Sequence, residues 1–461
     1  MNSARAEPSA PGGVSHLVEH LFREESGKMI AVLTRIFGLE HFQLAEDVMQ
    51  EALARALQTW PFYGVPANPA AWLMRVARNL ALDVVRRHRS FRDKQPEIIR
   101  LIEGDSAVAE QPVFSDQEIA DDRLRLMFVC CHPLIPQDAQ AALALKTLCG
   151  FGIAEIARAF LTSEAAIAKR LTRAKQRLRD EGIRFEIPAG AQLEPRLEGV
   201  LQSLYLLFNE GYKASAGEML VREEICGEAI RLAGLLAQHP AGNQPRTHAL
   251  LALMLLNAAR GPARVDADGN LVRLSEQNRT RWDAAKIARG MFHLAQSAAG
   301  GQLSEYHLQA GIAACHCAAP DYTTTDWARI LSLYNQLAAM DPSPVVALNR
   351  AVAVAQVRGP QAGIDAVAQI QSQGTLESYY LFHAVLGEFE AQLNHWAAAQ
   401  AHFSKALELV EMKSERAFLT QRLRVCAEKI SARCPESSTS FVPTIERSKI
   451  NRERAKTYEN K

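Results

Sequence analysis

Residues 152–178 read GIAEIARAFLTSEAAIAKRLTRAKQRL, and this stretch decides how the rest of the chain is interpreted. Its first part has apolar residues at helical spacing, and Thr162 or Ser163 can cap a second helix after a tight turn. The pattern predicts a helix-turn-helix whose second helix enters a DNA major groove, with an ordinary helical hairpin as the alternative. The side chains expected to cover the outside of that helix are basic: Lys169, Arg170, Arg173, Lys175 and Arg177.

A second basic helix is predicted from Pro69 onwards, with Asn68 as its cap. Residues 71–94 contain seven Lys or Arg and two Asp, which gives a local charge of +5. Basic side chains neutralise phosphates, Asn and Arg can read base edges, and an aromatic ring can stack on an unpaired base. The alternative is a basic surface helix without a ligand. The face that suits nucleic acid carries Trp72, Arg75, Asn79, Asp83 and Arg86 at helical spacing.

A third helix is predicted over about residues 42–60, with one apolar stripe along it. Its opposite face presents Asp47, Gln50 and Glu51 together, because residues three and four apart are neighbours on a helix. This acidic and amide patch suits a basic partner helix. The alternative is an ordinary solvated face.

Composition narrows the class of protein. The chain has 461 residues, of which 48% are hydrophobic and 22% charged, as in soluble globular proteins of about three domains. The net charge of +1 excludes a global attraction to nucleic acid, so any such attraction comes from local clusters. The N-terminus lacks the apolar core of a signal peptide, and no stretch approaches the ~20 apolar residues that span a bilayer. We therefore expect a cytoplasmic protein.

Cysteine and acidic clusters suggest metal sites only weakly. Residues 130–132 (CCH) and 315–317 (CHC) lack paired Cys-x-x-Cys halves, and Asp266, Asp268 and Gly269 do not have calcium-loop spacing. We predict eight reduced thiols, no metal, no cofactor and no catalytic residues.

Breaks in the helical pattern predict an all-α chain with several units. Three prolines over residues 61–69 predict an ordered loop, and residues 266–274 a turn followed by a short strand-like run. Near the C-terminus, helical runs recur at an offset of 35 residues, close to a tetratricopeptide repeat. The predicted units are a helical domain at 14–92, an acidic flexible linker at 93–122, a helix-turn-helix domain at 123–186, a helical domain at 196–300, repeats at 301–434 and a disordered tail at 435–461.

The order of these features resembles a bacterial extracytoplasmic-function sigma factor of RNA polymerase, in sigma-70 group IV. The resemblance extends to the long subgroup with a tetratricopeptide-like C-terminal extension, and it covers about residues 14–430. Three stretches carry it in the second half: LFNEGY at 207–212, QNRTRWD at 277–283 and PSPVVALNRAVA at 342–353. The chain departs from many short members at 163–167 (SEAAI), where they have a small-Gly-Thr-Val stretch.

The resemblance implies a set of partners and site residues. The partners are core RNA polymerase (the clamp of its largest subunit and the subunit carrying the −35 domain) and promoter DNA. No membrane and no conventional anti-sigma factor is expected. The implied roles are polymerase binding for Asp47, Gln50 and Glu51; −10 recognition for Trp72, Arg75, Arg78, Asn79, Asp83, Arg86 and Arg87; and −35 recognition for Ser163, Glu164, Lys169, Arg170, Arg173 and Lys175.

The resemblance also implies a mechanism without covalent chemistry. The loop at 61–69 captures a flipped base, the acidic linker lies in the RNA exit path, and the extension regulates promoter engagement. Three other classes remain as alternatives. A ligand-sensing helix-turn-helix repressor explains only the region after residue 138. A repeat scaffold predicts no promoter-specific effect on transcription. An enzyme in the second half would need catalytic residues that lie far apart in the sequence and come together only in the fold.

Overall fold

The chain folds into packed α-helices, as a computed structural model shows for residues 11–87, 116–160, 162–188, 190–212, 222–266, 270–370, 376–410 and 412–433. The predicted all-α class is confirmed, because the described residues contain no strand. Residues 270–274 were expected to be strand-like, but this part of the chain makes only an isolated antiparallel bridge between Val265 and Leu271. None of the described helices combines the length and apolar character needed to cross a membrane.

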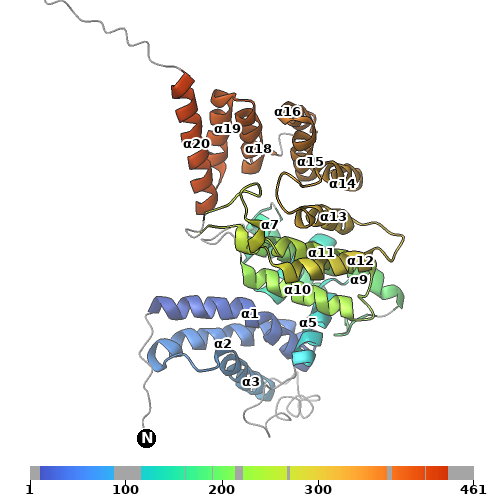
Figure 1. Cartoon of the computed structure of the whole chain (residues 1–461). Helices are drawn as coiled ribbons and strands as arrows, with labels where there is room; N and C mark the ends of the chain where they lie inside the picture. Colours follow the sequence, from blue (N-terminus) through green and yellow to red (C-terminus); the bar gives the residue numbers. More distant parts are fainter. Residues whose placement is uncertain are drawn as a thin grey trace, which may run out of the picture.

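The N-terminal bundle consists of α1 (Pro11–Phe37), α2 (Phe42–Tyr63) and α3 (Pro69–Arg87). It lies at the end of the molecule opposite the last helices (Figure 1). Helix α2 continues through Pro61 and ends at Tyr63, three residues beyond the predicted boundary at Trp60. Pro61 has no N–H to donate to the preceding turn, so the helix loses one hydrogen bond there and continues for only two more residues. Gly64 closes the helix with its N–H on the Trp60 carbonyl, 3.0 Å away.

The helix-turn-helix domain consists of α5 (Asp116–Cys130), α6 (Gln137–Cys149), α7 (Ile153–Ala159) and α8 (Glu164–Asp180). Its first helix begins inside the segment predicted as an acidic linker. Asp122, an acid counted for that linker, is buried and pairs with Arg35 of α1 at 2.8 Å. Net charge alone cannot separate a solvated acid from a paired one. The rest of the predicted linker, through residue 115, lies outside the described residues.

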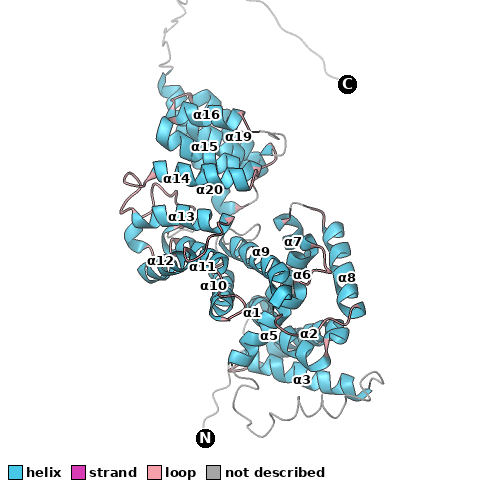
Figure 2. Cartoon of the chain, turned by 90° about the vertical axis from the view of Figure 1, so that its right-hand side faces the viewer, coloured by secondary structure: helices cyan, strands magenta, loops and turns pink. Residues whose placement is uncertain are grey.

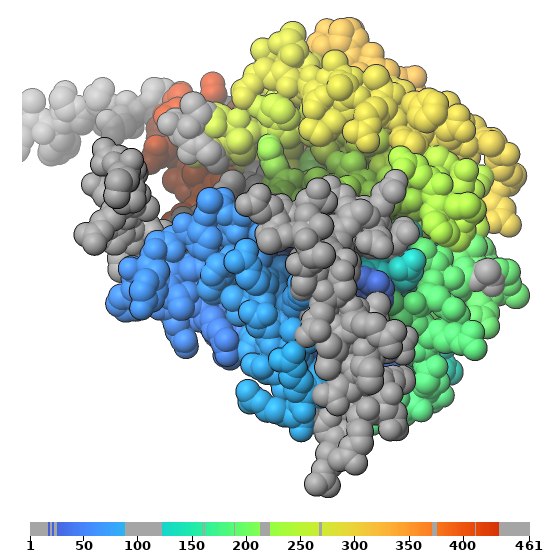
Figure 3. All heavy atoms as spheres, turned by 90° about the horizontal axis from the view of Figure 1, so that it is seen from below, coloured from blue at the N-terminus to red at the C-terminus, as the bar shows by residue number. Residues whose placement is uncertain are grey.

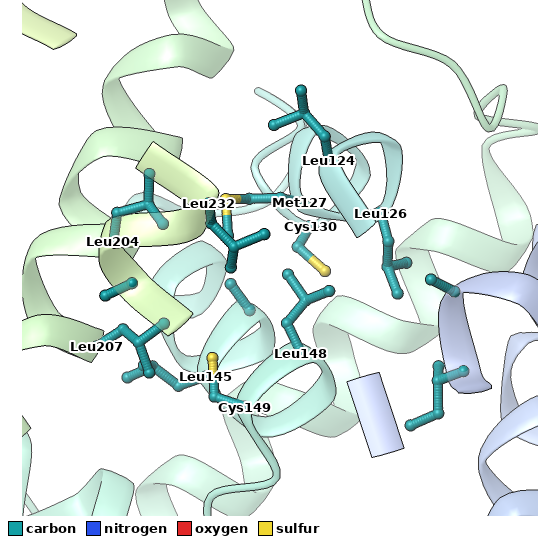
Figure 4. Packing of buried hydrophobic residues seen from close by; sticks show 14 of the residues in the cluster. Leu124, Leu126, Met127, Cys130, Leu145, Leu148, Cys149, Leu204, Leu207 and Leu232 are labelled. Atoms are coloured by element: carbon teal, nitrogen blue, oxygen red, sulfur yellow. The ribbon is translucent and has the colours of Figure 1, made fainter. Parts of the chain in front are cut away.

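The extension begins with a central group of helices that completes one continuous core. This core runs from α1 through the helix-turn-helix domain to α13. Figure 4 shows Leu124 and Met127 of α5, Leu148 of α6, Leu204 of α9 and Leu232 of α10 packed together. The second domain and the extension are therefore one packed body. The bounds are α9 (Leu193–Tyr212), α10 (Glu223–Gln238), α11 (Pro245–Ala258), α12 (Ala284–Ser297) and α13 (Glu305–Ala318).

The last helices pack in sequence, each mainly against its neighbours. Three smaller apolar cores follow one another from α13 to α20, as expected for a repeat architecture. The predicted tail at 435–461 lies outside the described residues. The bounds are α14 (Trp327–Met340), α15 (Pro344–Arg358), α16 (Pro360–Ala368), α18 (Tyr380–Gln392), α19 (Trp396–Leu409) and α20 (Lys413–Arg433).

Candidate nucleic-acid interface

Helix α2 presents the predicted acidic patch to solvent. Asp47, Gln50 and Glu51 are all exposed, because the opposite stripe of the helix is buried against α1 and α3. Gln43 Nε2 donates to Asp47 Oδ1 at 3.0 Å, and Arg55 Nε lies 3.1 Å from Glu51 Oε1. The three side chains form one accessible polar face on a rigid helix, as a docking site for a basic partner requires.

Helix α3 begins where the sequence predicts. Asn68 Oδ1 accepts a hydrogen bond from the Ala71 N–H at 3.0 Å, which caps the helix. Trp72 lies half-buried against Trp60, with ring centroids 5.4 Å apart and planes at 64°. Arg78 is also partly buried, whereas Arg75, Asn79, Asp83, Arg86 and Arg87 are exposed.

Two exposed aromatic side chains at the end of α2 were not predicted. Phe62 is 81% exposed and Tyr63 is 88% exposed, the two largest exposures among the big hydrophobic side chains of the described chain. They come directly before Gly64, at the turn into α3. Two solvated aromatic rings beside a basic helix offer stacking surface for unpaired bases. The signal in the sequence was an aromatic pair within the proline-rich segment that was predicted to be a loop.

The helix-turn-helix forms with both predicted helices. The Gly152 N–H donates to Glu155 Oε2 at 2.8 Å, which closes the start of α7, and the Ala166 N–H donates to Ser163 Oγ at 3.3 Å, which caps α8. The inner side of α8 is buried as expected. The side chains exposed on its outer face include Ser163, Glu164, Lys169, Arg173 and Arg177.

Two of the predicted DNA-contacting side chains of α8 are instead engaged within the protein. Arg170 Nε lies 3.1 Å from Asp138 of α6, and Lys175 Nζ lies 2.5 Å from Glu46 of α2. Figure 2 shows α8 lying beside α2. Lys169 and Arg173 therefore lie on an exposed face, whereas Lys175 lies in a contact between two domains.

Ion pairs also join the extension to the helix-turn-helix. Arg222, just before α10, pairs with Glu155 of α7 at 3.0 Å, and Glu210 of α9 lies 3.8 Å from the same guanidinium. Arg123 of α5 is almost completely buried and pairs with Glu228 of α10. These pairs fix the orientation of the helix-turn-helix relative to the extension.

The cysteines of the segment 130–132, which suggest a metal site only weakly, lie in the apolar core. Cys130 and Cys131 are buried, and burial raises the pKa of each thiol, to about 12 for Cys131. Such thiols are poor ligands and poor nucleophiles. Within the described ranges, no three His, Cys, Asp or Glu side chains gather in a way that could hold a metal ion.

Comparison with known proteins places three family models on the chain. Residues 21–91 match sigma-70 region 2, residues 125–178 match sigma-70 region 4, and residues 196–298 match a family of unknown function. The two sigma-70 models cover α2, α3, α7 and most of α8. No solved structure matches the chain.

Three relatives illustrate how far the similarity extends. An uncharacterized protein of Rhizobium meliloti (strain 1021) is 40% identical over 398 residues, which is 86% of this chain and 92% of that protein. ECF RNA polymerase sigma factor SigE of Mycolicibacterium smegmatis is 29% identical over 163 residues, 35% of this chain and 60% of its own. A probable RNA polymerase sigma factor, RfaY, of Xanthomonas campestris pv. campestris is 30% identical over 139 residues, 30% of this chain and 34% of its own.

Proposed function

Because the chain belongs to the sigma-70 family of RNA polymerase sigma factors, we propose that it is a group IV member whose C-terminal extension regulates promoter engagement. The observation that carries the proposal is the order of three surfaces: an exposed acidic face on α2, an exposed basic face on α3 and a basic recognition helix, α8. A sigma factor needs all three in one chain. It directs the polymerase to promoters and makes no covalent bond itself.

Polymerase docking uses the exposed face of α2. Asp47, Gln50 and Glu51 meet the clamp of the largest subunit, where basic side chains complement their charge. We expect Asp47→Arg to reduce binding to core polymerase by at least about tenfold, because two like charges then face each other. Glu408→Arg is the matched control, since Glu408 is also an exposed acid and lies on α19, far along the extension.

Promoter melting uses α3 and the turn before it. Arg75, Arg86 and Arg87 neutralise phosphates, while Trp72, Arg78, Asn79 and Asp83 face the unpaired −10 bases. Each base that leaves the helix loses stacking worth a few kcal/mol, and contacts in the protein replace that stacking.

Recognition of the −35 element uses α8. Ser163 and Glu164 lie at its N-terminal end, which enters the major groove, and Lys169, Arg170 and Arg173 contact phosphates or bases. Lys175 joins them once it leaves Glu46. The subunit that carries this domain in the polymerase completes the −35 contact.

The extension acts as a regulator in cis. It shares a core and several ion pairs with the helix-turn-helix domain, so it moves with the −35 domain and needs no separate anti-sigma protein to reach it. Its last helices, which we assign to the tetratricopeptide type, offer further surface for a partner.

The test is transcription by purified core polymerase with the full chain, on its own upstream region and on random promoter fragments. Start sites that share two upstream elements are the expected result. Binding to closed duplex without polymerase, together with no polymerase complex, would favour the helix-turn-helix repressor. No promoter-specific effect at all would favour a repeat scaffold.

A further inference from the structure

The extension contains a cavity of about 550 Å³ between α12, α13 and α14. The residues that join α12 to α13 form one wall of it, and Leu303 in that wall is 54% exposed. Figure 3 shows the yellow part of the chain, around residue 300, exposed at one edge of the molecule. The volume lies within the range of about 300–1,000 Å³ that is usual for sites of small organic ligands. A small molecule can therefore enter this cavity from solvent.

The floor of the cavity is apolar. Leu308 of α13 and Leu333 of α14 are buried side chains that line it, together with Leu294 of α12. Gly311 of α13 also lines the floor, and a Cβ atom placed there would lie 3.3 Å from the Leu333 side chain. At Gly301 in the wall, by contrast, no atom lies within 4 Å of an added Cβ. Such a floor favours a ligand with an apolar body, because both surfaces leave water on binding.

His307 holds the wall of the cavity in place. Its Nδ1 accepts a hydrogen bond from the Ser304 N–H at 3.1 Å, and its Nε2 lies 3.2 Å from the Ser297 carbonyl oxygen. An imidazole that accepts at Nδ1 and donates at Nε2 is neutral, so His307 brings no charge to the cavity. The ring ties the start of α13 to the end of α12. The cavity is therefore formed before a ligand binds.

Arg329 of α14 is the one charged side chain among the residues that line the cavity. It is exposed, and no ion pair of the described residues involves its guanidinium. The nearby Asp326 does not line the cavity, and its Oδ1 accepts from the backbone N–H of Arg329 at 2.8 Å as the cap of α14. The lining is therefore positive. A guanidinium can bind a carboxylate through two parallel N–H donors, so a ligand with one negative charge complements it.

A thiol and two amides complete the lining. Burial and the Asp326 carboxylate raise the pKa of the Cys315 thiol, and the guanidinium of Arg329 opposes that shift, so the thiol and the cation are neighbours. The side chains of Gln302 and Gln336 are exposed at the rim. An apolar floor with a cation and amides above it suits a molecule that is apolar at one end and anionic at the other.

We propose that this cavity binds a small organic anion, with the apolar body of the ligand over Leu308 and Leu333 and its carboxylate or sulfonate on Arg329. The site lies where two cores meet, since α13 contributes Tyr306 to the large core and Ile312 to the first of the smaller cores. A ligand held between α12 and α14 therefore acts at the junction between the repeats and the body that contains the helix-turn-helix. Binding itself does not depend on the proposed function and can be tested without transcription.

The first test titrates the full-length protein with 8-anilinonaphthalene-1-sulfonate, an aromatic anion whose fluorescence reports apolar sites. Arg329→Gln should weaken its binding by about tenfold, because a hydrogen bond between charged groups is lost. N-phenyl-1-naphthylamine has the same rings without the sulfonate and should bind both proteins equally. Arg358→Gln is the matched control, at an exposed arginine of α15 outside the cavity, and should change neither affinity. Equal affinity of the sulfonate for wild type and Arg329→Gln would overturn the proposal.

The second test reduces the space in the cavity without altering charge. Gly301→Leu adds an apolar side chain at a lining position where the Cβ meets no other atom, so both probes should bind about tenfold more weakly. Gly227→Leu adds the same side chain on α10, again with open space around its Cβ, and should leave both affinities unchanged. Equal weakening in the two leucine variants would show that the probes bind elsewhere and would overturn the site.

Alkylation of Cys315 by N-ethylmaleimide locates the bound probe. With the sulfonate at about ten times its Kd, the rate at Cys315 should fall by about tenfold, because the site is then empty only about a tenth of the time. Cys317 is also partly exposed but does not line the cavity, so its rate should not change, and fragment ions of the shared peptide distinguish the two thiols. An unchanged rate at Cys315 would overturn the proposal. Protection of Cys315 that grows with protein concentration alone would also overturn it, since a second copy would then cover the cavity.

Discussion

Arg123 joins the second domain to the extension at a buried position. Its guanidinium is 1% exposed, pairs with Glu228 and donates to the Leu148 carbonyl at 3.4 Å. Arg123→Ala should cost about 3–5 kcal/mol in the free energy of unfolding, because it leaves a partly buried carboxylate without that partner. The measurement is urea denaturation. Arg231→Ala removes a more exposed partner of the same carboxylate and should cost below about 1 kcal/mol, and an equal loss in both variants would contradict this assignment.

His316 makes the stability of the extension depend on pH. Burial, together with the charges of Arg260 and Arg279, lowers the pKa of His316 to about 3. The unfolded chain takes up a proton at this residue near pH 6.5, whereas the folded chain does not, so stability falls as the pH drops below that value. From pH 7 to pH 5 the loss should be about 2 kcal/mol.

Urea denaturation at the two pH values checks this expectation, with His316→Gln as the comparison. The variant should lose about 2 kcal/mol less than wild type over the same interval. Identical losses would show that another group sets the pH dependence.

The site residues illustrate what a sequence can and cannot predict at this scale. Asn68 was expected as a cap and Ser163 as one of two candidate caps, and both are found as caps, because a cap depends only on residues three positions away. The Glu46–Lys175 pair joins residues 129 positions apart, so no local pattern indicates it. The position of Lys175 along its helix is the same whether its side chain contacts DNA or pairs with Glu46.

Among the elements, the turn between α2 and α3 offers the sharpest functional test. Phe62→Ala and Tyr63→Ala each remove an exposed ring, so neither should lower stability by more than about 0.5 kcal/mol. If either ring stacks on an unpaired base, its loss should weaken open-complex formation by about 1–3 kcal/mol.

Permanganate footprinting of the melted bases measures this effect, and polymerase binding provides the control, which should not change. A Leu57→Ala variant, which removes another exposed hydrophobic side chain of α2 (44% exposed), should leave melting intact. Full melting in both aromatic variants would remove these rings from the mechanism.

Element boundaries were predictable wherever a local signal existed. The start of α3 follows from Asn68 and Pro69, whereas the continuation of α2 through Pro61 depends on packing at Trp60, which is buried. Helix α5 begins at Asp116 within an acidic run, since tertiary partners such as Arg35 neutralise Asp122. Partners distant in sequence override the local pattern in both cases.

The whole molecule should unfold in two steps. One core joins α1 through α13, whereas the helices from α14 onward have separate small cores between neighbours. Phe403→Ala, at a fully buried position in the last core, should cost about 3–5 kcal/mol and lower only one transition. Leu197→Ala, fully buried in the large core, should lower the other.

Differential scanning calorimetry measures both transitions. A single transition that shifts in both variants would show that the chain unfolds as one cooperative body. The shared core could not be predicted from the sequence. The helices of the extension are recognisable from the helical period of their apolar residues. Which domain those apolar residues pack against is set by contacts between segments distant in sequence, such as α5 and α10.

The shared core of the helix-turn-helix domain and the extension has a consequence for where other regulators can bind near a promoter. Under the proposed function, about half of the mass of the chain would lie at the upstream edge of the promoter, because α9 and the helices beyond it share a core with the helix-turn-helix domain. An activator bound immediately upstream would compete with that mass for the same stretch of duplex. Genes read by this protein are therefore expected to have their operator sites displaced upstream or placed downstream of the start site, and their control to depend on the sigma factor itself.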